Sequence, residues 1–234
     1  MFSVLTPAES EALWLSLKIA TVSVLGSLPI GFALAWLLAR KQFPGKSLLD
    51  AVVHLPLVLP PVVIGYALLL GFGRRGPIGA WLEETFGIVF AFRWTGAALA
   101  CAIMGLPLMV RAMRQSLEAI DTRLDAAAAT LGANRFWVLA TVTLPLSLPG
   151  ILTGALLAFA RSLGEFGATI TFVSNIPGET QTLPLAIYSY TQVPGGDAQA
   201  LRLCVLSIAL SLAALLVSEW LVRRTNRRVA GHAA

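Results

Sequence analysis

The residues best suited to do chemistry are two opposite charges, Arg161 and Glu165, in an apolar stretch that begins at Leu144. Side chains four apart share one face of a helix, and Ser162 and Thr169 add hydroxyl groups beside them. Charges inside a membrane are costly and usually face the bundle interior or a water-filled path. These four residues therefore predict either a polar path or gate, or an ion pair that only fixes the orientation of its helix.

Catalytic and metal-binding chemistry is not indicated elsewhere in the sequence. There are two histidines, His54 and His232, and two cysteines, Cys101 and Cys204. They form no His-Glu-x-x-His motif, no metal-ligand spacing and no Ser/His/Asp constellation. A phosphate-binding Walker motif is also missing. We therefore expect no catalytic residue, no metal site and no cofactor bound by this chain.

The chain that carries these residues has unusually little charge. Of its 234 residues, 57% are hydrophobic and 12% are charged, and the mean hydropathy is +0.79. A soluble domain is about 25% charged. The apolar residues also form long blocks separated by short charged stretches. This pattern predicts an all-α integral membrane protein.

Five segments are apolar over the roughly 20 residues that a membrane-spanning helix needs. They cover about residues 12–39, 51–72, 94–113, 144–172 and 201–222 of a single domain, residues 1–234. The segment Gly79–Phe92 is apolar but short, and it contains Glu83 and Glu84. We expect this segment at the membrane interface, with a sixth span as the alternative.

The distribution of basic residues between the spans predicts the orientation, because cytoplasmic loops are enriched in lysine and arginine. Alternate loops place eleven basic residues on one side: Arg40, Lys41, Lys46, Arg111, Arg114, Arg123, Arg135, Arg223, Arg224, Arg227 and Arg228. The other side receives four: Arg74, Arg75, Arg93 and Arg202. We expect a cytoplasmic C-terminus, a periplasmic N-terminus and a cytoplasmic loop over residues 114–143.

This loop predicts two short helices joined by a turn. Asp121 or Thr122 can cap the first helix, a run of alanines propagates it, and Gly132 can end it in the left-handed conformation. Asn134 can cap the second helix, residues 135–141. A helix lying on the membrane surface is one alternative. DNA reading is disfavoured, because two arginines make a thin basic footprint.

The spacing within the loop resembles the signature of ABC-importer permeases, which is Glu-Ala-Ala, three residues, Gly, nine residues, then Ile-x-Leu-Pro. Here the matching positions are Ala127, Ala128, Gly132, Val142, Leu144 and Pro145, while Ala126 stands in place of the glutamate and Asp125 precedes it. The resemblance implies a type I ABC-importer fold. It also implies that these eight residues belong to a coupling helix that docks in a groove of an ATPase subunit.

Longer stretches are similar to the permeases of molybdate importers. They are residues 43–46, 54–61, 158–168 and 174–180, and the similarity extends from about residue 10 to 222. Sulfate and thiosulfate permeases share the Gly-Glu-Phe-Gly-Ala element of residues 164–168, so they remain the alternative, together with tungstate.

The resemblance implies a membrane-spanning subunit that moves molybdate across the bacterial inner membrane by alternating access. Five spans are few for a complete path, so we expect a homodimer, and the implied partners are two ATPase subunits and a periplasmic binding protein. The ATPase subunits would use the ATP and Mg²⁺, and no nucleic acid is expected. A secondary transporter is the alternative of a different class, but no repeat is evident, and Glu165 is the one carboxylate well inside a span.

Overall fold

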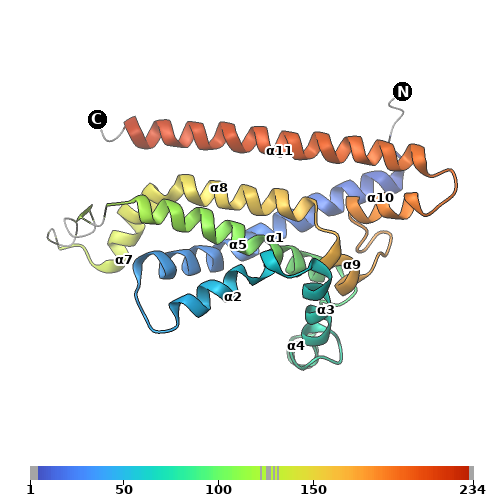
Figure 1. Ribbon diagram of the computed structural model, residues 1–234, viewed down its shortest axis with the longest axis horizontal. Coiled ribbons are helices and arrows are strands. Elements are labelled where there is room, and N and C mark those ends of the chain that lie inside the picture. The colour runs from blue at the N-terminus through green and yellow to red at the C-terminus, as the bar shows by residue number, and fades with distance from the viewer. Residues whose placement is uncertain (1–4, 122, 125–127, 129, 131, 232–234) are drawn as a thin grey trace.

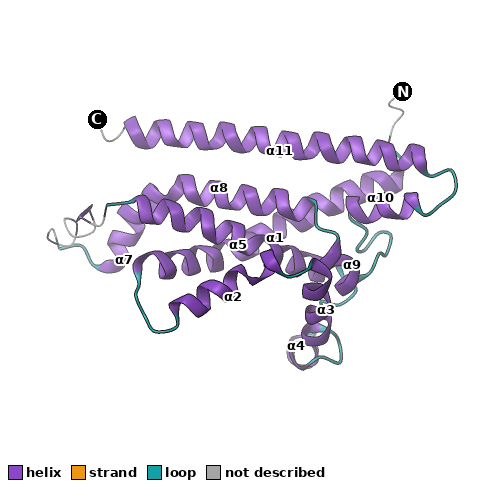
Figure 2. Ribbon diagram, viewed as in Figure 1, coloured by secondary structure: helices purple, strands orange, loops and turns teal. Residues whose placement is uncertain are grey.

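In the computed structural model, which describes residues 5–121, 123, 124, 128, 130 and 132–231, every regular element is a helix (Figure 2). The first half contains α1 (Pro7–Arg40), α2 (Lys46–Val58), α3 (Pro61–Phe72), α4 (Pro77–Phe86) and α5 (Trp94–Ala119). The second half contains α7 (Arg135–Val138), the π-helix η1 (Leu139–Thr143), α8 (Leu144–Leu163), α9 (Gly167–Val173), α10 (Leu183–Thr191) and α11 (Asp197–Gly231).

The centre of the bundle is formed by α1, α5 and α8, which lie side by side (Figure 1). Small residues let these helices approach closely, as they commonly do in membranes. A Cβ atom built on Gly154 of α8 would lie 2.8 Å from the Met109 carbonyl oxygen of α5. Met109, Met113 and Leu117 fill the space beside this contact and are fully buried.

The predicted span over residues 51–72 is divided into two helices, and the second is bent by 114° relative to the first. The cause is the pair Pro60–Pro61, because a residue that precedes proline is restricted to extended backbone. Leu59 and Pro60 are both extended, with ψ angles of 143° and 133°. As a result α3, followed by α4, projects away from the bundle (Figure 1).

The predicted span over residues 144–172 is also divided. Its first part is longer than predicted, since α7, η1 and α8 give one apolar helical stretch from Phe136 to Leu163. The helix then ends, and α9 begins only at Gly167. Glu165 therefore lies in the break after α8, and the expectation that it shares a helix with Arg161 is wrong.

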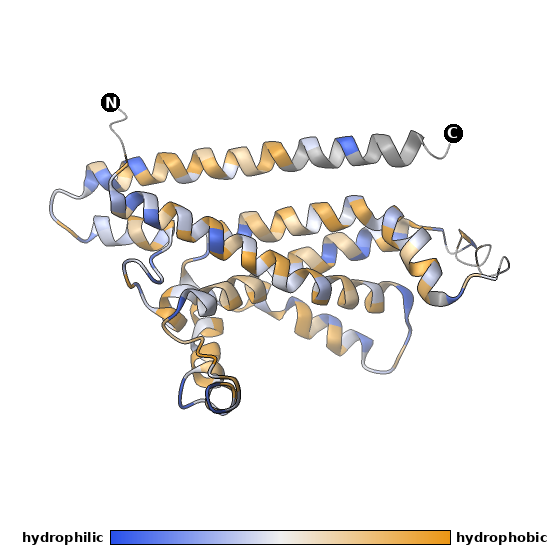
Figure 3. Ribbon diagram, turned by 180° about the vertical axis from the view of Figure 1, so that it is seen from behind, coloured by the Kyte–Doolittle hydropathy of each residue, from blue (hydrophilic) through white to orange (hydrophobic). Residues whose placement is uncertain are grey.

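Among the described residues, four helices are long and apolar enough to cross a membrane, and the bent pair α2–α3 brings the number to five. This agrees with the expected number of spans. The helix α4 has 10 residues, which corresponds to about 15 Å, half of the hydrocarbon core. The last helix, α11, packs along α8 and α10, and its part Asp197–Val217 is mostly apolar and little buried (Figure 3).

Candidate functional site

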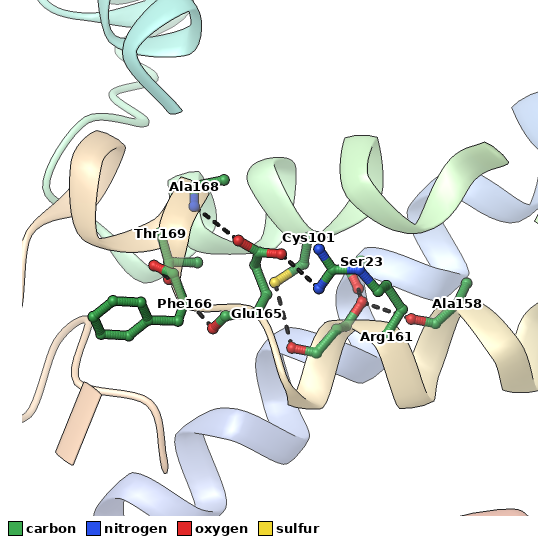
Figure 4. A network of polar contacts seen from close by, with 9 residues as sticks. Ser23, Cys101, Ala158, Arg161, Glu165, Phe166, Ala168 and Thr169 are labelled. Carbon is green, nitrogen blue, oxygen red and sulfur yellow. Dashed lines mark hydrogen bonds and ion pairs between the residues drawn. The ribbon is translucent and has the colours of Figure 1, made fainter. Parts of the chain in front are cut away.

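The carboxylate of Glu165 bridges the break between α8 and α9. Arg161, in the last turn of α8, places Nη1 2.7 Å from Glu165 Oε2. The second oxygen, Glu165 Oε1, accepts a 2.7 Å hydrogen bond from the backbone amide of Ala168 in the first turn of α9 (Figure 4). Glu165 thus links the end of one helix to the beginning of the next.

The surroundings of this carboxylate make the link strong. The Glu165 side chain is 1% exposed, whereas that of Arg161 is 28% exposed. Removing one partner of a buried ion pair costs about 3–5 kcal/mol, because the other charge is left without compensation. The ion pair and the hydrogen bond of Glu165 therefore hold the end of α8 to the start of α9.

Ser162 and Thr169, the hydroxyl residues of the predicted site, are buried and hydrogen-bonded within the bundle. Ser162 Oγ donates to the Ala158 carbonyl at 2.8 Å and lies 3.1 Å from Ser23 Oγ of α1 (Figure 4). Thr169 Oγ1 donates to the Phe166 carbonyl at 2.9 Å. The structure brings all the predicted residues of this site into one region, but in this conformation the hydroxyl groups do not face an open path.

The helix α9 is seated directly on α3. A Cβ atom built on Gly65 would lie 2.5 Å from the Ala168 carbonyl oxygen, and one built on Gly167 would lie 2.8 Å from Pro61 Cβ. At the end of α9, Phe172 and Val173 are fully buried in the same core cluster as Ala168. The two short helices form one packed unit, which we call the α3–α9 unit.

The predicted coupling residues that the structure describes lie at or before the other end of α8. Asp125, Ala126 and Ala127 lie outside the described residues. Gly132 has the expected left-handed conformation, with φ at +87°, and the Ala133 amide donates to the Ala128 carbonyl at 3.2 Å.

The second half of the loop differs from the prediction. Asn134 Oδ1 accepts a 2.8 Å bond from the Trp137 amide, as expected of a cap. The helix that follows is not a separate piece ending at residue 141, because it continues without interruption through Val142 in η1 into Leu144 and Pro145 of α8. The stretch of chain between helices α5 and α7 is thus residues 120–134, and we call it the coupling segment after the role predicted for it.

This arrangement leaves a shallow surface beside the coupling segment. Phe136 and Trp137 are largely exposed. A hollow of about 440 Å³ lies next to them, lined by Ala128, Gly132, Ala133, Asn134, Trp137 and Thr141. Exposed aromatic side chains beside a hollow are typical of a surface that another protein covers.

Sequence reasoning missed a second polar cluster, between α2 and α5. Arg114 Nη1 lies 3.0 Å from Asp50 Oδ1, and Arg114 Nε donates to Glu118 Oε1 at 2.8 Å. His54 Nδ1 lies 2.8 Å from the Asp50 carbonyl oxygen. The spacing of Arg114 and Glu118 was a usable signal, but nothing in the sequence pairs Asp50 with a residue 64 positions away. Within the described part of the chain, no three His, Cys, Asp or Glu side chains could hold a metal ion.

Comparison with known proteins gives the chain its family. Residues 27–229 match the family described as binding-protein-dependent transport system inner membrane component. The chain belongs to this family. It is 61% identical to the molybdenum transport system permease protein ModB of Escherichia coli K12, over 96% of this chain and 98% of that protein. The ModB protein of Haemophilus influenzae is 59% identical over 94% of this chain and 96% of its own length.

More distant relatives differ in their named substrate. The sulfate transport system permease protein CysT of Escherichia coli is 39% identical over 86% of this chain and 72% of its own length. Among solved structures, a bacterial ABC transporter involved in alginate import has a TM-score of 0.74 at 17% identity, with 94% of this chain and 80% of that chain covered. The MetNI methionine ABC transporter has a TM-score of 0.69 at 18% identity, with 92% and 94% covered. These two structures support the ABC-importer fold.

Proposed function

We propose that this chain is the membrane-spanning permease of an ATP-driven importer for molybdate. The observation that carries the proposal is the 61% identity to a molybdenum transport permease over nearly the full length of both proteins. The sulfate relative, at 39% identity, makes sulfate the second candidate. Tungstate has the same tetrahedral, doubly charged form as molybdate, and the binding protein that delivers the ion would distinguish the two.

A second copy of the chain would complete the translocation path. Irregular backbone at membrane depth is tolerated only where it is buried in protein or lines a water-filled cavity. The bend at Leu59–Pro60 and the break at residues 164–166 both interrupt spans. Apolar side chains on the uncovered face of α2 and α3 are exposed beside the bend, namely Val58, Val62, Val63, Tyr66 and Leu70. These features favour a homodimer with the path along its two-fold axis.

The ATP-dependent step would enter through the coupling segment. We assign Asp125, Ala126, Ala127, Ala128, Gly132, Val142, Leu144 and Pro145 to docking on an ATPase subunit. Since α7, η1 and α8 form one helical stretch, movement of the docked segment would pass along α8. The Arg161–Glu165 joint would carry it into α9 and so into the α3–α9 unit. In this proposal that unit is the gate, the joint drives it, and Ser162 and Thr169 support it from within the bundle.

The remaining partners follow from the same assignment. The coupling segment would face the cytoplasm. One ATPase subunit would dock on each of the two copies of this chain, and the ATPase subunits would bind and hydrolyse MgATP. A periplasmic binding protein would deliver the ion to the opposite face. ATP binding would open the path outward, and loss of the hydrolysis products would return it inward.

Uptake into vesicles that contain the assembled transporter tests the substrate. Radiolabelled molybdate should accumulate only with ATP and the binding protein, and unlabelled molybdate or tungstate should compete more strongly than sulfate. If sulfate competes best, the chain is a sulfate permease.

The Glu165→Gln variant tests the gate. Glutamine retains an acceptor for the Ala168 amide but removes the charge that pairs with Arg161. We expect ATP hydrolysis to persist while uptake falls on the order of tenfold or more, the scale of a broken coupling contact. Glu83→Gln is the matched control, because Glu83 forms a looser, exposed pair with Arg74 at 3.8 Å. Unchanged uptake in Glu165→Gln would refute the gating role.

A further inference from the structure

The ion pairs of Arg114 join α5 to α2. Helix α5 leads to the coupling segment, and α2 leads to the α3–α9 unit that we propose as the gate. The Arg114 guanidinium group uses one nitrogen for Asp50 of α2 and another for Glu118 of α5, at 3.0 and 2.8 Å. Arginine presents several donors in a fixed planar fork, so it can hold the two carboxylates in one geometry. Asp50 is fixed further through its carbonyl oxygen, 2.8 Å from His54 Nδ1 one helical turn away.

One side of this bridge leads to the coupling segment. Arg114 and Glu118 lie in the last turns of α5, which ends at Ala119, and the coupling segment begins at the next residue. There, the Ile120 carbonyl accepts a 3.4 Å bond from Arg40 Nη2 at the end of α1. A displacement of the coupling segment therefore acts directly on the end of α5.

The other side leads to the proposed gate. The helix α2 ends at the bend at Leu59–Pro60, and beyond the bend α3 is packed on α9. Val53 is the single buried residue of α2, so apolar packing holds this helix only weakly to the bundle. The Arg114 bridge therefore adds a polar attachment of α2 to α5 beside this limited apolar packing.

The bridge is also accessible to water, unlike the joint at Glu165. The side chains of Arg114, Asp50 and Glu118 are 28%, 39% and 47% exposed. They line a hollow of about 300 Å³ together with His54, Arg111 and Gln115. Ion pairs exposed to this extent are weak and are exchanged readily for water, so this contact can open and close during a transport cycle.

We propose that Arg114 is a positioning residue that couples the coupling segment to the gate through α2, in parallel with the path through α8. The inference rests on the proposed function. In the conformation described here the bridge is closed, and α2 follows the end of α5. The α3–α9 unit then receives movement from both sides, through α8 and Glu165 on one side and through α5, Arg114 and α2 on the other.

Charge variants of the assembled transporter test this role. We would measure molybdate uptake per ATP hydrolysed for Arg114→Gln, Asp50→Asn and the exchanged pair Arg114→Asp/Asp50→Arg. Each single variant should lose uptake per ATP on the order of fivefold or more, the lower end of typical coupling effects, while ATP hydrolysis stays near the parent rate. The exchanged pair should recover most of the loss, because it restores the attraction between α2 and α5. Arg111→Gln is the matched control, an exposed arginine of the same hollow with no ion pair among the described residues, and it should match the parent.

A second measurement separates this inference from the identity of the transported ion. In a background of Cys101→Ala and Cys204→Ala, the half-buried Leu59 at the bend is replaced by cysteine, and its alkylation rate is measured with and without ATP. ATP should change the rate in the parent transporter, and Arg114→Gln should abolish the change. This result would support the role of Arg114 even if the vesicles accumulated sulfate instead of molybdate.

Three outcomes would overturn the inference. The first is parental uptake per ATP in both single variants. The second is alkylation at the bend that does not respond to ATP in the parent, or responds equally in Arg114→Gln. The third is a loss of thermal stability and assembly in the single variants that the exchanged pair does not recover, which would leave Arg114 a purely structural role.

Discussion

The contact between α3 and α9 supports a quantitative prediction for Gly65→Ala. The added methyl group would lie 2.5 Å from the Ala168 carbonyl oxygen and 2.9 Å from both Ala168 Cα and Thr171 Cβ. The first distance falls about 0.9 Å short of the 3.4 Å at which ordinary contact begins. Two of the three obstacles are backbone atoms, so a change of side-chain rotamer cannot relieve the clash. The two helices must move apart instead.

The expected magnitude follows from two opposing effects. Overpacking of this kind costs about 1–3 kcal/mol, whereas alanine in place of glycine favours a helix by about 1 kcal/mol. We expect a net destabilisation of up to about 2 kcal/mol, and 2 kcal/mol corresponds to a fall in Tm of roughly 4–8 °C for a chain of this size. Uptake should fall as well, because α3 can no longer follow α9 closely.

Thermal unfolding of the purified protein in detergent, with uptake measured in parallel, checks this prediction. Gly71→Ala on the same helix is the control, since its nearest neighbour would be Ile78 Cδ1 at 4.0 Å. That variant gains helix propensity without a clash, so its Tm should equal or exceed the parent value. If Gly65→Ala were as stable and as active as Gly71→Ala, α3 and α9 would not form a tightly packed unit.

Three further variants test other parts of the structure by thermal unfolding or ATP hydrolysis. Gly132→Ala should lower the free energy of unfolding by about 1–2 kcal/mol, because its φ of +87° is unfavourable for a residue with a Cβ atom. It should also lower the ATP hydrolysis of the assembled transporter. The control Gly164→Ala should be neutral, since φ is −94° and the space around it is open. Arg202→Ala should lower the free energy of unfolding by about 3–5 kcal/mol, because it leaves the buried Glu9 carboxylate without its partner at 2.7 Å. Replacing both residues with glutamine should lower it by less, since no charge is then left unpaired. Ser16→Ala should cost about 1–3 kcal/mol, since its hydroxyl accepts a 2.7 Å bond from the first amide of α10; an unchanged Tm would mean that water replaces the hydroxyl.

The all-helical fold and the number of apolar spans were predicted from the sequence, because hydropathy reports directly on which segments can replace water with lipid. The sequence was less informative about where the spans break. Pro60 and Pro61 were a visible signal for the bend, but the angle depends on how α3 packs on α9. The break before α9 has its own signal, a glycine on each side of Glu165 and Phe166, which the apolar character of the segment concealed.

At the candidate site the ion pair was predicted, but its arrangement was not. Arg161 and Glu165 form the expected pair, yet across a helix end and not along a helix. The bridge between Arg114 and Asp50 could not be predicted, since it depends on how α2 packs on α5. Long-range ion pairs of this kind are determined by tertiary packing, and local spacing carries no information about them.

The ion pair between Glu9 and Arg202 also constrains the order in which the chain can be assembled. The two residues are 193 positions apart, and at roughly 5–20 residues per second a ribosome needs about 10–40 s to synthesise the intervening chain. During that time Glu9 is not wholly without partners, because Oε2 accepts a 2.8 Å bond from the Thr6 amide at the start of its own helix. The other oxygen receives its cation only when the last span has entered the membrane. The Glu9–Arg202 ion pair therefore forms late in biogenesis, when the start of α11 reaches the start of α1.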